Sequence, residues 1–240
     1  MNRILCALAF LLSVGAVASA DFSPRPVQAV FDKIYAPDGF DSNDLVQVVA
    51  EGHFPDSCYR LADAKVEVDL VNHEILLRPS ALKYGGMCLQ VIVPFHRVIN
   101  IGLMPVGKYK IVQAVHGAPL GEMTIRPAQS REPDDFLYAP ISQAVLQNVS
   151  GKAFVMISGV FPSSCFSMQE VRVKVEDDLI VVQPIANFAA SRDCKSGKFP
   201  FENTVAVPEV VSGGRYLLHV RSMNGQAVNS LVDFNPGYLQ

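Results

Sequence analysis

The sequence predicts an all-β protein built as two tandem β-sandwich domains. A seven-residue phrase occurs twice, as GHFPDSC at 52–58 and as GVFPSSC at 159–165, with five identities and a spacing of 107. Apolar residues, mostly Val, Ile, Leu and Phe, come in short runs divided by Gly and Pro, which is typical of strands and turns. Half of the chain is hydrophobic, enough for a core in each copy.

Residues 1–20 have the pattern of a secretory signal peptide. One positive charge precedes an apolar run from Ile4 to Val17, and the segment ends in Ala-Ser-Ala. The run is too short to span a bilayer, and no later stretch offers 18 consecutive apolar residues. We therefore expect cleavage after Ala20, no transmembrane segment, and a secreted or periplasmic protein.

The duplication extends well beyond the phrase and predicts two domains, 21–128 and 129–240, joined by a charged, proline-bearing stretch at 126–135. Upstream, Val27–Phe31 resembles Ser142–Leu146, with about eight extra residues in the first copy. Further matches pair 66–69 with 173–176, 75–79 with 180–184, Pro94-Phe95 with Pro200-Phe201, and Gly107-Lys108-Tyr109 with Gly214-Arg215-Tyr216.

Alternating residues identify individual strands. Val171, Val173 and Val175 alternate with charged residues, which predicts a strand with one core face and one outer face. Segments 65–70, 46–52 and 153–159 also read as strands. Asn224-Gly225 favours a two-residue type I′ hairpin, because both positions need positive φ. About seven strands per copy, spaced by 8–12 residues and without a helix, are typical of a sandwich of about 100 residues.

The repeated phrase reads as a corner of the fold. Gly52 and Gly159 are expected to end a strand where a bulge or positive φ is needed. The following Phe54 and Phe161 would turn inward, and the next residue in each copy, a proline, would end the ladder because it has no N–H.

The cysteines read as structural disulfides. Cys58, Cys88, Cys165 and Cys194 are an even number in an exported chain. If each copy folds around its own core, the pairs are Cys58–Cys88 and Cys165–Cys194. Closing such loops stabilises a domain by about 3–4 kcal/mol in the chain-entropy model.

No metal or cofactor site is expected. The histidines have no HxH or HxxxH spacing, and none occupies the same slot in both copies. We interpret His116 as a turn residue. Acidic clusters at 41–44, 132–135 and 176–178 lack EF-hand spacing and are interpreted as solvated turns, with Ca²⁺ binding as the alternative. The histidines concerned are His53, His73, His96, His116 and His219.

Catalytic patterns and nucleic-acid signatures are also missing from the sequence. Ser163 and Ser164 lie in no G-x-S-x-G elbow, and no glycine-rich phosphate loop occurs. The formal net charge of −3, without a basic patch, argues against a nucleic-acid partner. We expect that the protein is not an enzyme.

Two G-x-F-P-x-S-C corners, a later Cys and a G-[KR]-Y strand in each copy resemble tandem immunoglobulin-like sandwich proteins exported by bacteria. The resemblance covers about 25–235 and concerns architecture. It implies two immunoglobulin-like domains but no particular function. The layout is also similar to periplasmic pilus chaperones, although the basic Arg/Lys pair of their cleft has no counterpart here.

Two functions follow as hypotheses. The preferred one is a non-enzymatic exported binding module, or cell-envelope structural part, that recognises a protein or a glycan. The alternative is an exported enzyme or inhibitor with its site on loops 36–44 or 185–198, where the copies differ most. Phe154 and Met156, which replace Gln47 and Val49 of the first copy, indicate a contact surface, with packing between the domains as the favoured interpretation.

Overall fold

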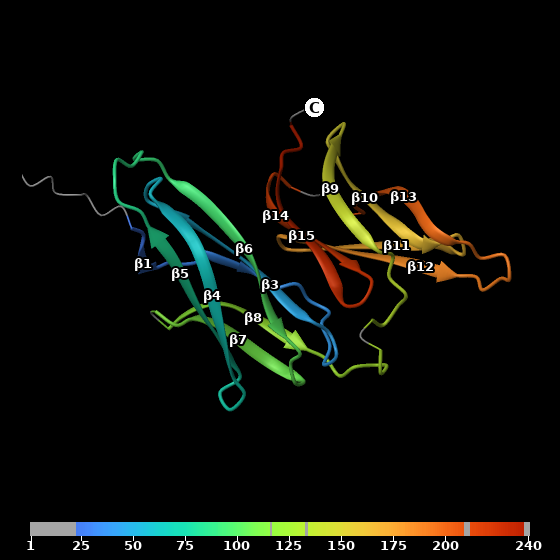
Figure 1. Cartoon of the computed structure of the whole chain (residues 1–240), viewed down its shortest axis with the longest axis horizontal. Coiled ribbons are helices and arrows are strands. Elements are labelled where there is room, and N and C mark those ends of the chain that lie inside the picture. The colour runs from blue at the N-terminus through green and yellow to red at the C-terminus, as the bar shows by residue number, and fades with distance from the viewer. Residues whose placement is uncertain (1–22, 116, 133, 209–211, 238–240) are drawn as a thin grey trace, which may run out of the picture.

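A computed structural model describes residues 23–115, 117–132, 134–208 and 212–237; the expected signal peptide and His116 lie outside these ranges. The described residues form strands, turns and bends and no helix, as predicted (Figure 1). The strands of the first half are β1 (Arg25–Gln28), β2 (Lys33–Tyr35), β3 (Val46–Phe54), β4 (Tyr59–Asp69), β5 (Glu74–Lys83), β6 (Val93–Gly102), β7 (Gly107–Gln113) and β8 (Ala118–Ile125). Those of the second half are β9 (Ile141–Val149), β10 (Lys152–Ser163), β11 (Phe166–Glu176), β12 (Leu179–Phe188), β13 (Ser196–Ala206), β14 (Gly214–Ser222) and β15 (Gln226–Phe234).

Each half contains a smaller and a larger sheet. In the first half, β2-β3-β6 form the smaller sheet, and β4, β5, β7 and β8, with β1 beside β5, form the larger one. In the second half, β13-β10-β9 and β11-β12-β14-β15 repeat this division. The coarse prediction of an all-β chain in two halves, each with two sheets, is therefore confirmed.

One pairing in each half departs from the immunoglobulin pattern. β5 runs parallel to β7, with Glu74 opposite Lys110, and β12 runs parallel to β14, with Leu179 opposite Leu217. Immunoglobulin sandwiches are built from antiparallel sheets. An immunoglobulin-like fold is thus not confirmed.

Side chains from both sheets meet in one core per half. In the second half, Val155 and Ile157 of the smaller sheet join Ile180, Val182 and other buried residues of the larger one. The predicted inward face of β11 is confirmed, because Val171, Val173 and Val175 pack against that core. Equivalent residues of the first half, including Val48, Ala50, Ile75 and Leu77, are fully buried.

The structure corrects the alignment of the two N-terminal segments. Ala29 donates its N–H to the carbonyl of Pro79, and Ala139 donates to that of Pro184, so Ala29 corresponds to Ala139 rather than to Ala144. Ala29 stands 23 positions before Gly52, and Ala139 stands 20 before Gly159. The first copy therefore has three extra residues instead of about eight, and similar letters in two apolar stretches misled the sequence comparison.

The glycines of the repeated phrase meet the expectation only in part. Neither has positive φ, and Gly159 but not Gly52 lies at a register shift, in the pairing of β10 with β9. A Cβ on Gly52 would lie 2.6 Å from the Val30 carbonyl and from the Phe95 ring, and one on Gly159 would lie 1.9 Å from the Pro140 carbonyl. Glycine is needed because two backbone segments and an aromatic ring approach closely there.

The phenylalanines of the corner follow the prediction in both copies, whereas the proline ends the strand only in the first. Phe54 and Phe161 are buried, with ring centroids 4.4 Å from Phe95 and 4.3 Å from Phe201, respectively. β3 ends at Phe54, whereas β10 continues to Ser163 with a register shift around its proline. The 224–225 hairpin has φ values of 62° and 68° as predicted, but the strands leave three residues, 223–225, in the loop.

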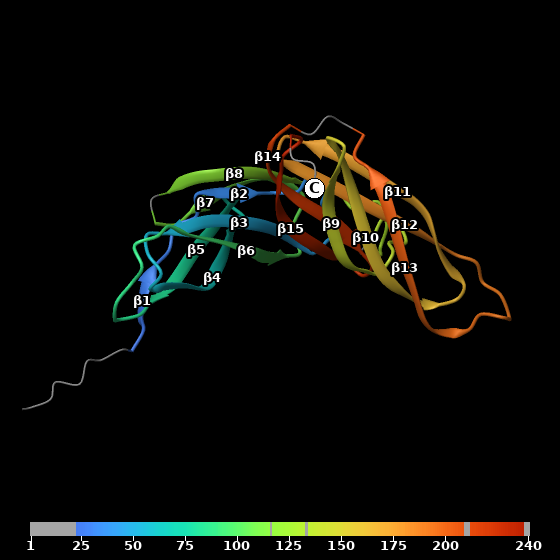
Figure 2. The ribbon, with the colours of Figure 1, turned by 90° about the horizontal axis from the view of Figure 1, so that it is seen from above.

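The two halves pack against each other through one face of each. Tyr35 and Val49 on the outer side of the smaller sheet of the first half contact Leu217 on the outer side of the larger sheet of the second half. Asn229 donates a hydrogen bond to Gln47 across the contact, at 3.0 Å. We call this contact the joint. Figure 2 shows that the halves form an arch, with β14 and β15 next to the first half.

Candidate binding surface

Both halves carry one disulfide, Cys58–Cys88 and Cys165–Cys194, as predicted. Each bond ties the corner phrase to a later loop, which joins β5 to β6 in the first half and β12 to β13 in the second. The Cα atoms of each pair are 5.4 Å apart, within the usual range. Disulfides persist in oxidising compartments, so these two indicate an extracytoplasmic location.

The loops held by the disulfides have the same backbone frame. In the first half, the backbone N–H of Ser57 donates to the Leu89 carbonyl at 3.1 Å, and the backbone N–H of Leu89 donates to the Ser57 hydroxyl at 2.9 Å. In the second, Ser164 and Lys195 exchange the same two bonds, both at 3.0 Å. Leu89 and Lys195 therefore occupy equivalent positions on equivalent scaffolds.

The first of these loops, residues 84–92, exposes large apolar side chains. Met87 is fully exposed, and Leu89 and Ile92 are 71% and 72% exposed. Val91 and Tyr84 are exposed as well. Several large apolar side chains on one fixed loop are a typical feature of interaction sites. We call residues 84–92 the apolar loop.

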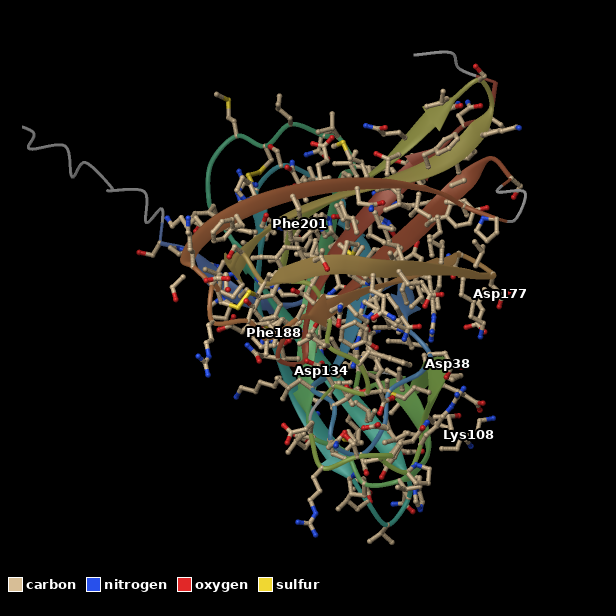
Figure 3. All side chains as sticks on the ribbon, turned by 90° about the vertical axis from the view of Figure 1, so that its right-hand side faces the viewer. Asp38, Lys108, Asp134, Asp177, Phe188 and Phe201 are labelled. Carbon is tan, nitrogen blue, oxygen red and sulfur yellow. A yellow bond between two sulfur atoms is a disulfide. The ribbon has the colours of Figure 1, made fainter. Side chains whose placement is uncertain are left out.

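The corresponding segment of the second half, residues 189–198, is polar. Counting from the paired cysteines, Asp193, Lys195 and Lys198 stand where the apolar loop has Met87, Leu89 and Ile92. The two loops lie at opposite ends of the arch (Figures 1 and 2). Aromatic rings pack near Cys165: the ring centroids of Phe166 and Phe188 are 4.8 Å apart, and those of Phe161 and Phe201 are 4.3 Å apart. Phe188 and Phe201 are labelled in Figure 3.

The apolar loop was not among the loops singled out from the sequence. Loops 36–44 and 185–198 were singled out because the copies differ most there, and 185–198 contains the polar counterpart of the apolar loop rather than the apolar loop itself. A position-by-position comparison of the residues flanking Cys88 and Cys194 would have found it.

Loop 36–44 is part of the joint. Phe40 is buried, with its ring centroid 5.9 Å from that of His219 in an edge-on arrangement. Asp44 is buried and accepts a hydrogen bond from the Arg221 guanidinium. Asn43 donates to the carbonyls of Ser130 and Glu132. This loop therefore connects the two halves.

Two acidic clusters that are far apart in the sequence meet around Arg221. Asp134 lies 4.0 Å from the guanidinium, and its carboxylate accepts the N–H groups of Asn224 and Gly225 at 2.8 and 3.0 Å. Burial raises the pKa values of Asp134 and Asp135, and the charges of neighbouring aspartates raise them further. A guanidinium and backbone amides thus surround Asp134, and the labelled residue lies at the meeting of the halves in Figure 3.

The histidines have separate environments. His219 is completely buried and bonds to Asn229 at 2.7 Å, and burial lowers its pKa to about 4, so it is neutral at pH 7. His53 bonds to Asp32 at 2.7 Å at the surface. His73 has a φ of 52° in the turn between β4 and β5.

Two shallow grooves flank the joint. One of about 320 Å³ is lined by Asp32, Glu51, His53, His96 and Arg215, among others. Arg215 lies 3.3 Å from Glu51 there, so charged groups of the two halves are paired. The second, of about 340 Å³, is bordered by paired charges such as Arg126 and Asp38. Opposite charges in both grooves favour a structural role for these residues.

Among the described residues, one group combines three possible metal-ligand side chains, namely Asp56, Cys58 and Cys88. Its two sulfur atoms form the disulfide, so they are not thiolates and do not bind a metal as such. In the part of the chain that the structure describes, no helix is long and apolar enough to cross a membrane.

The fold and the site define the molecule as a two-part all-β protein in which each half has two sheets and one disulfide. Residues 48–117 match the family described as the ORF11 beta-sandwich domain. The match spans less than one third of the chain, from β3 to just beyond β7, and includes the apolar loop. Comparisons with curated proteins and with solved structures give no match.

Proposed function

We propose that the chain is a non-enzymatic, secreted or periplasmic binding module that recognises a protein through the apolar loop. The observation that carries this proposal is the exposure of Met87, Leu89 and Ile92 on a loop fixed by a disulfide and by two hydrogen bonds to Ser57. A fixed loop orders little further on binding, so less free energy is lost than with a mobile one.

The chemistry of the loop favours a protein partner over a glycan. Thioether and aliphatic side chains supply apolar area but almost no hydrogen-bonding groups. An apolar patch on a protein partner matches such a surface. The immunoglobulin-like relationship and the export by a signal peptide remain predictions that agree with this role.

The test compares two variants with the wild-type protein. Met87→Ser/Leu89→Ser/Ile92→Ser removes the apolar side chains, and Asp193→Ser/Lys195→Ser/Lys198→Ser changes the matching positions of the second half. Each protein is immobilised and used to retain proteins from the extracytoplasmic fraction of the source cells, with quantification by mass spectrometry. We expect a protein retained by the wild type and the second variant, with a loss of at least about tenfold for the first.

Equal retention by all three proteins would contradict the proposal. Retention of the wild type by neutral phospholipid vesicles, abolished by the first variant, would assign the loop to a lipid surface instead. Thermal unfolding of both variants controls for folding, because all six substituted residues are exposed.

A further inference from the structure

The joint uses different faces of the two halves. We name the outer side of β2, β3 and β6, or of β9, β10 and β13, the small-sheet face of a half. The outer side of β4, β5, β7 and β8, or of β11, β12, β14 and β15, is its large-sheet face. The small-sheet face of the first half packs on the large-sheet face of the second. Such a head-to-tail contact leaves two faces uncovered by the other half: the large-sheet face of the first half and the small-sheet face of the second.

Charges occupy the large-sheet face left over in the first half. The strand registers pair Glu74 with Lys110 and Lys110 with Glu122. In the second half the same three positions hold Leu179, Leu217 and Leu231, all of which pack in the joint. The leftover face is therefore polar, and Lys108 beside it lies at the surface in Figure 3. Terminal faces of repeat arrays are typically polar in this way, because they meet water.

The small-sheet face left over in the second half has an apolar centre among polar residues. The registers place Met156 between Val145 and Thr204, and Phe154 between Gln147 and Ala206. Val145 and Val160 are exposed, and Phe154 and Met156 are partly exposed and belong to no core cluster. The expectation that Phe154 and Met156 pack between the domains is thus wrong, because Gln47 and Val49 of the first half make that contact.

The apolar small-sheet face lacks the charges of the joint. In the first half, Lys33 and Glu51 on this face pair with Asp178 and Arg215 of the second half. The strand registers place Gln143 and Ser158 at the corresponding positions of the second half. Suppose that this face packed on the large-sheet face of the first half of another copy. Glu74, Lys110 and Glu122 of that copy would be buried against a face that offers no charged residues at the positions of Lys33 and Glu51, and their desolvation would cost free energy.

We propose that the small-sheet face of the second half binds the same face of a second copy of this chain, forming a two-fold dimer. Its centre consists of Val145, Phe154 and Met156, which are neutral, so two such faces meet without repulsion between like charges. Charged residues flank this centre: Glu202 lies on the edge strand β13, and the exposed Lys152 stands two positions before Phe154 on β10. This site is separate from the apolar loop and goes beyond the proposed function.

The size of the face indicates a weak dimer. Three strands of about nine residues cover about 14 by 30 Å. Together the two faces cover about 840 Å², which is less than the roughly 1,200 Å² of stable interfaces and corresponds to a weak, transient contact. The dimer should therefore dissociate within a concentration range that sedimentation can follow.

Sedimentation velocity of the purified, oxidised protein between about 1 and 200 μM tests the proposal. We expect a concentration-dependent dimer for the wild type, a monomer for Met156→Asp, and an unchanged dimer for the control Thr124→Asp, which adds the same charge to the large-sheet face of the first half. Phe154→Ser/Met156→Ser is the milder second variant if the aspartate variant does not fold.

A wild-type monomer at about 200 μM, or an unchanged dimer in a folded Met156 variant, would overturn the proposal. Polymers larger than a dimer would show head-to-tail association instead. The Met87→Ser/Leu89→Ser/Ile92→Ser variant should still dimerise, so failure of the dimer and failure of the proposed function are distinguishable.

Discussion

The apolar loop and its polar counterpart differ in side chains while sharing a backbone frame. The same serine–loop hydrogen bonds and a disulfide hold both, yet one presents Leu89 and the other Lys195 at the same position. The difference shows that the corner phrase specifies how the loop is held and leaves its exposed residues to vary. Function is therefore best sought where equivalent positions of the two halves differ in polarity.

The largest loss of stability is expected from a substitution in the joint, where the second half has Arg221 and the first has Ala114 at the corresponding position. Arg221→Ala leaves the buried Asp44 without its cation, which should cost about 3–5 kcal/mol of unfolding free energy. Urea unfolding followed by circular dichroism measures this loss. Arg172→Ala breaks an exposed ion pair with Glu170 and should cost under about 1 kcal/mol; equal losses for both would refute the structural role of Arg221.

The two disulfides should contribute almost equally. They close loops with sequence separations of 30 and 29, so Cys58→Ser/Cys88→Ser and Cys165→Ser/Cys194→Ser should each cost about 3–4 kcal/mol. Chemical denaturation of both double variants gives the comparison. A difference greater than about 2 kcal/mol would show that the two halves are not equivalent in stability.

His219, which corresponds to Val112, should make stability depend on pH. Because burial lowers its folded-state pKa to about 4 from an ordinary value of 6.5, the unfolded state binds more protons between these values. Its stabilising effect is complete above about pH 6.5 and falls by up to about 3 kcal/mol as the pH drops towards 4. The His219→Val variant should lose this part of the pH dependence in urea titrations at pH 4.5 and 7.5; an unchanged slope would contradict the assignment.

The corner glycines should differ in their tolerance of a methyl group. Gly159→Ala brings a Cβ closer to a carbonyl oxygen than Gly52→Ala does, at 1.9 against 2.6 Å. Overpacking of this kind costs about 1–3 kcal/mol, and we expect Gly159→Ala at the upper end of that range. Differential scanning calorimetry of the two variants decides the order, and a more stable Gly159 variant would refute it.

The sequence predicts the parts of this fold that depend on local pattern and on duplication. Strand alternation at Val171–Val175 and the positive φ values at 224–225 follow from local pattern, and both disulfide pairings follow from the duplication. The parallel pairs β5–β7 and β12–β14 do not, because the strand pairing depends on long-range packing that no local pattern encodes. The convergence of Asp44, Asp134 and Arg221 was equally hidden, since these residues are separated by 90 and 87 positions.

The sequence comparison chose the wrong residues for the packing between the domains. Both Gln47/Val49 and Phe154/Met156 lie on outward faces, and polarity alone favoured the second pair for packing between the domains. In the structure the first pair packs in the joint, and ion pairs of Glu51 and Lys33 accompany it there. Charge complementarity at the edge of a contact thus favours the face that carries these charges.

A reciprocal exchange of loop side chains tests the central claim most directly. Met87→Asp/Leu89→Lys/Ile92→Lys gives the first half the polar residues, and Asp193→Met/Lys195→Leu/Lys198→Ile gives the second half the apolar ones. Binding of both variants to the retained protein partner is measured by calorimetry. The account predicts that the first exchange abolishes binding and that adding the second to it restores measurable binding at the opposite end of the molecule; full binding by the first exchange alone would contradict it.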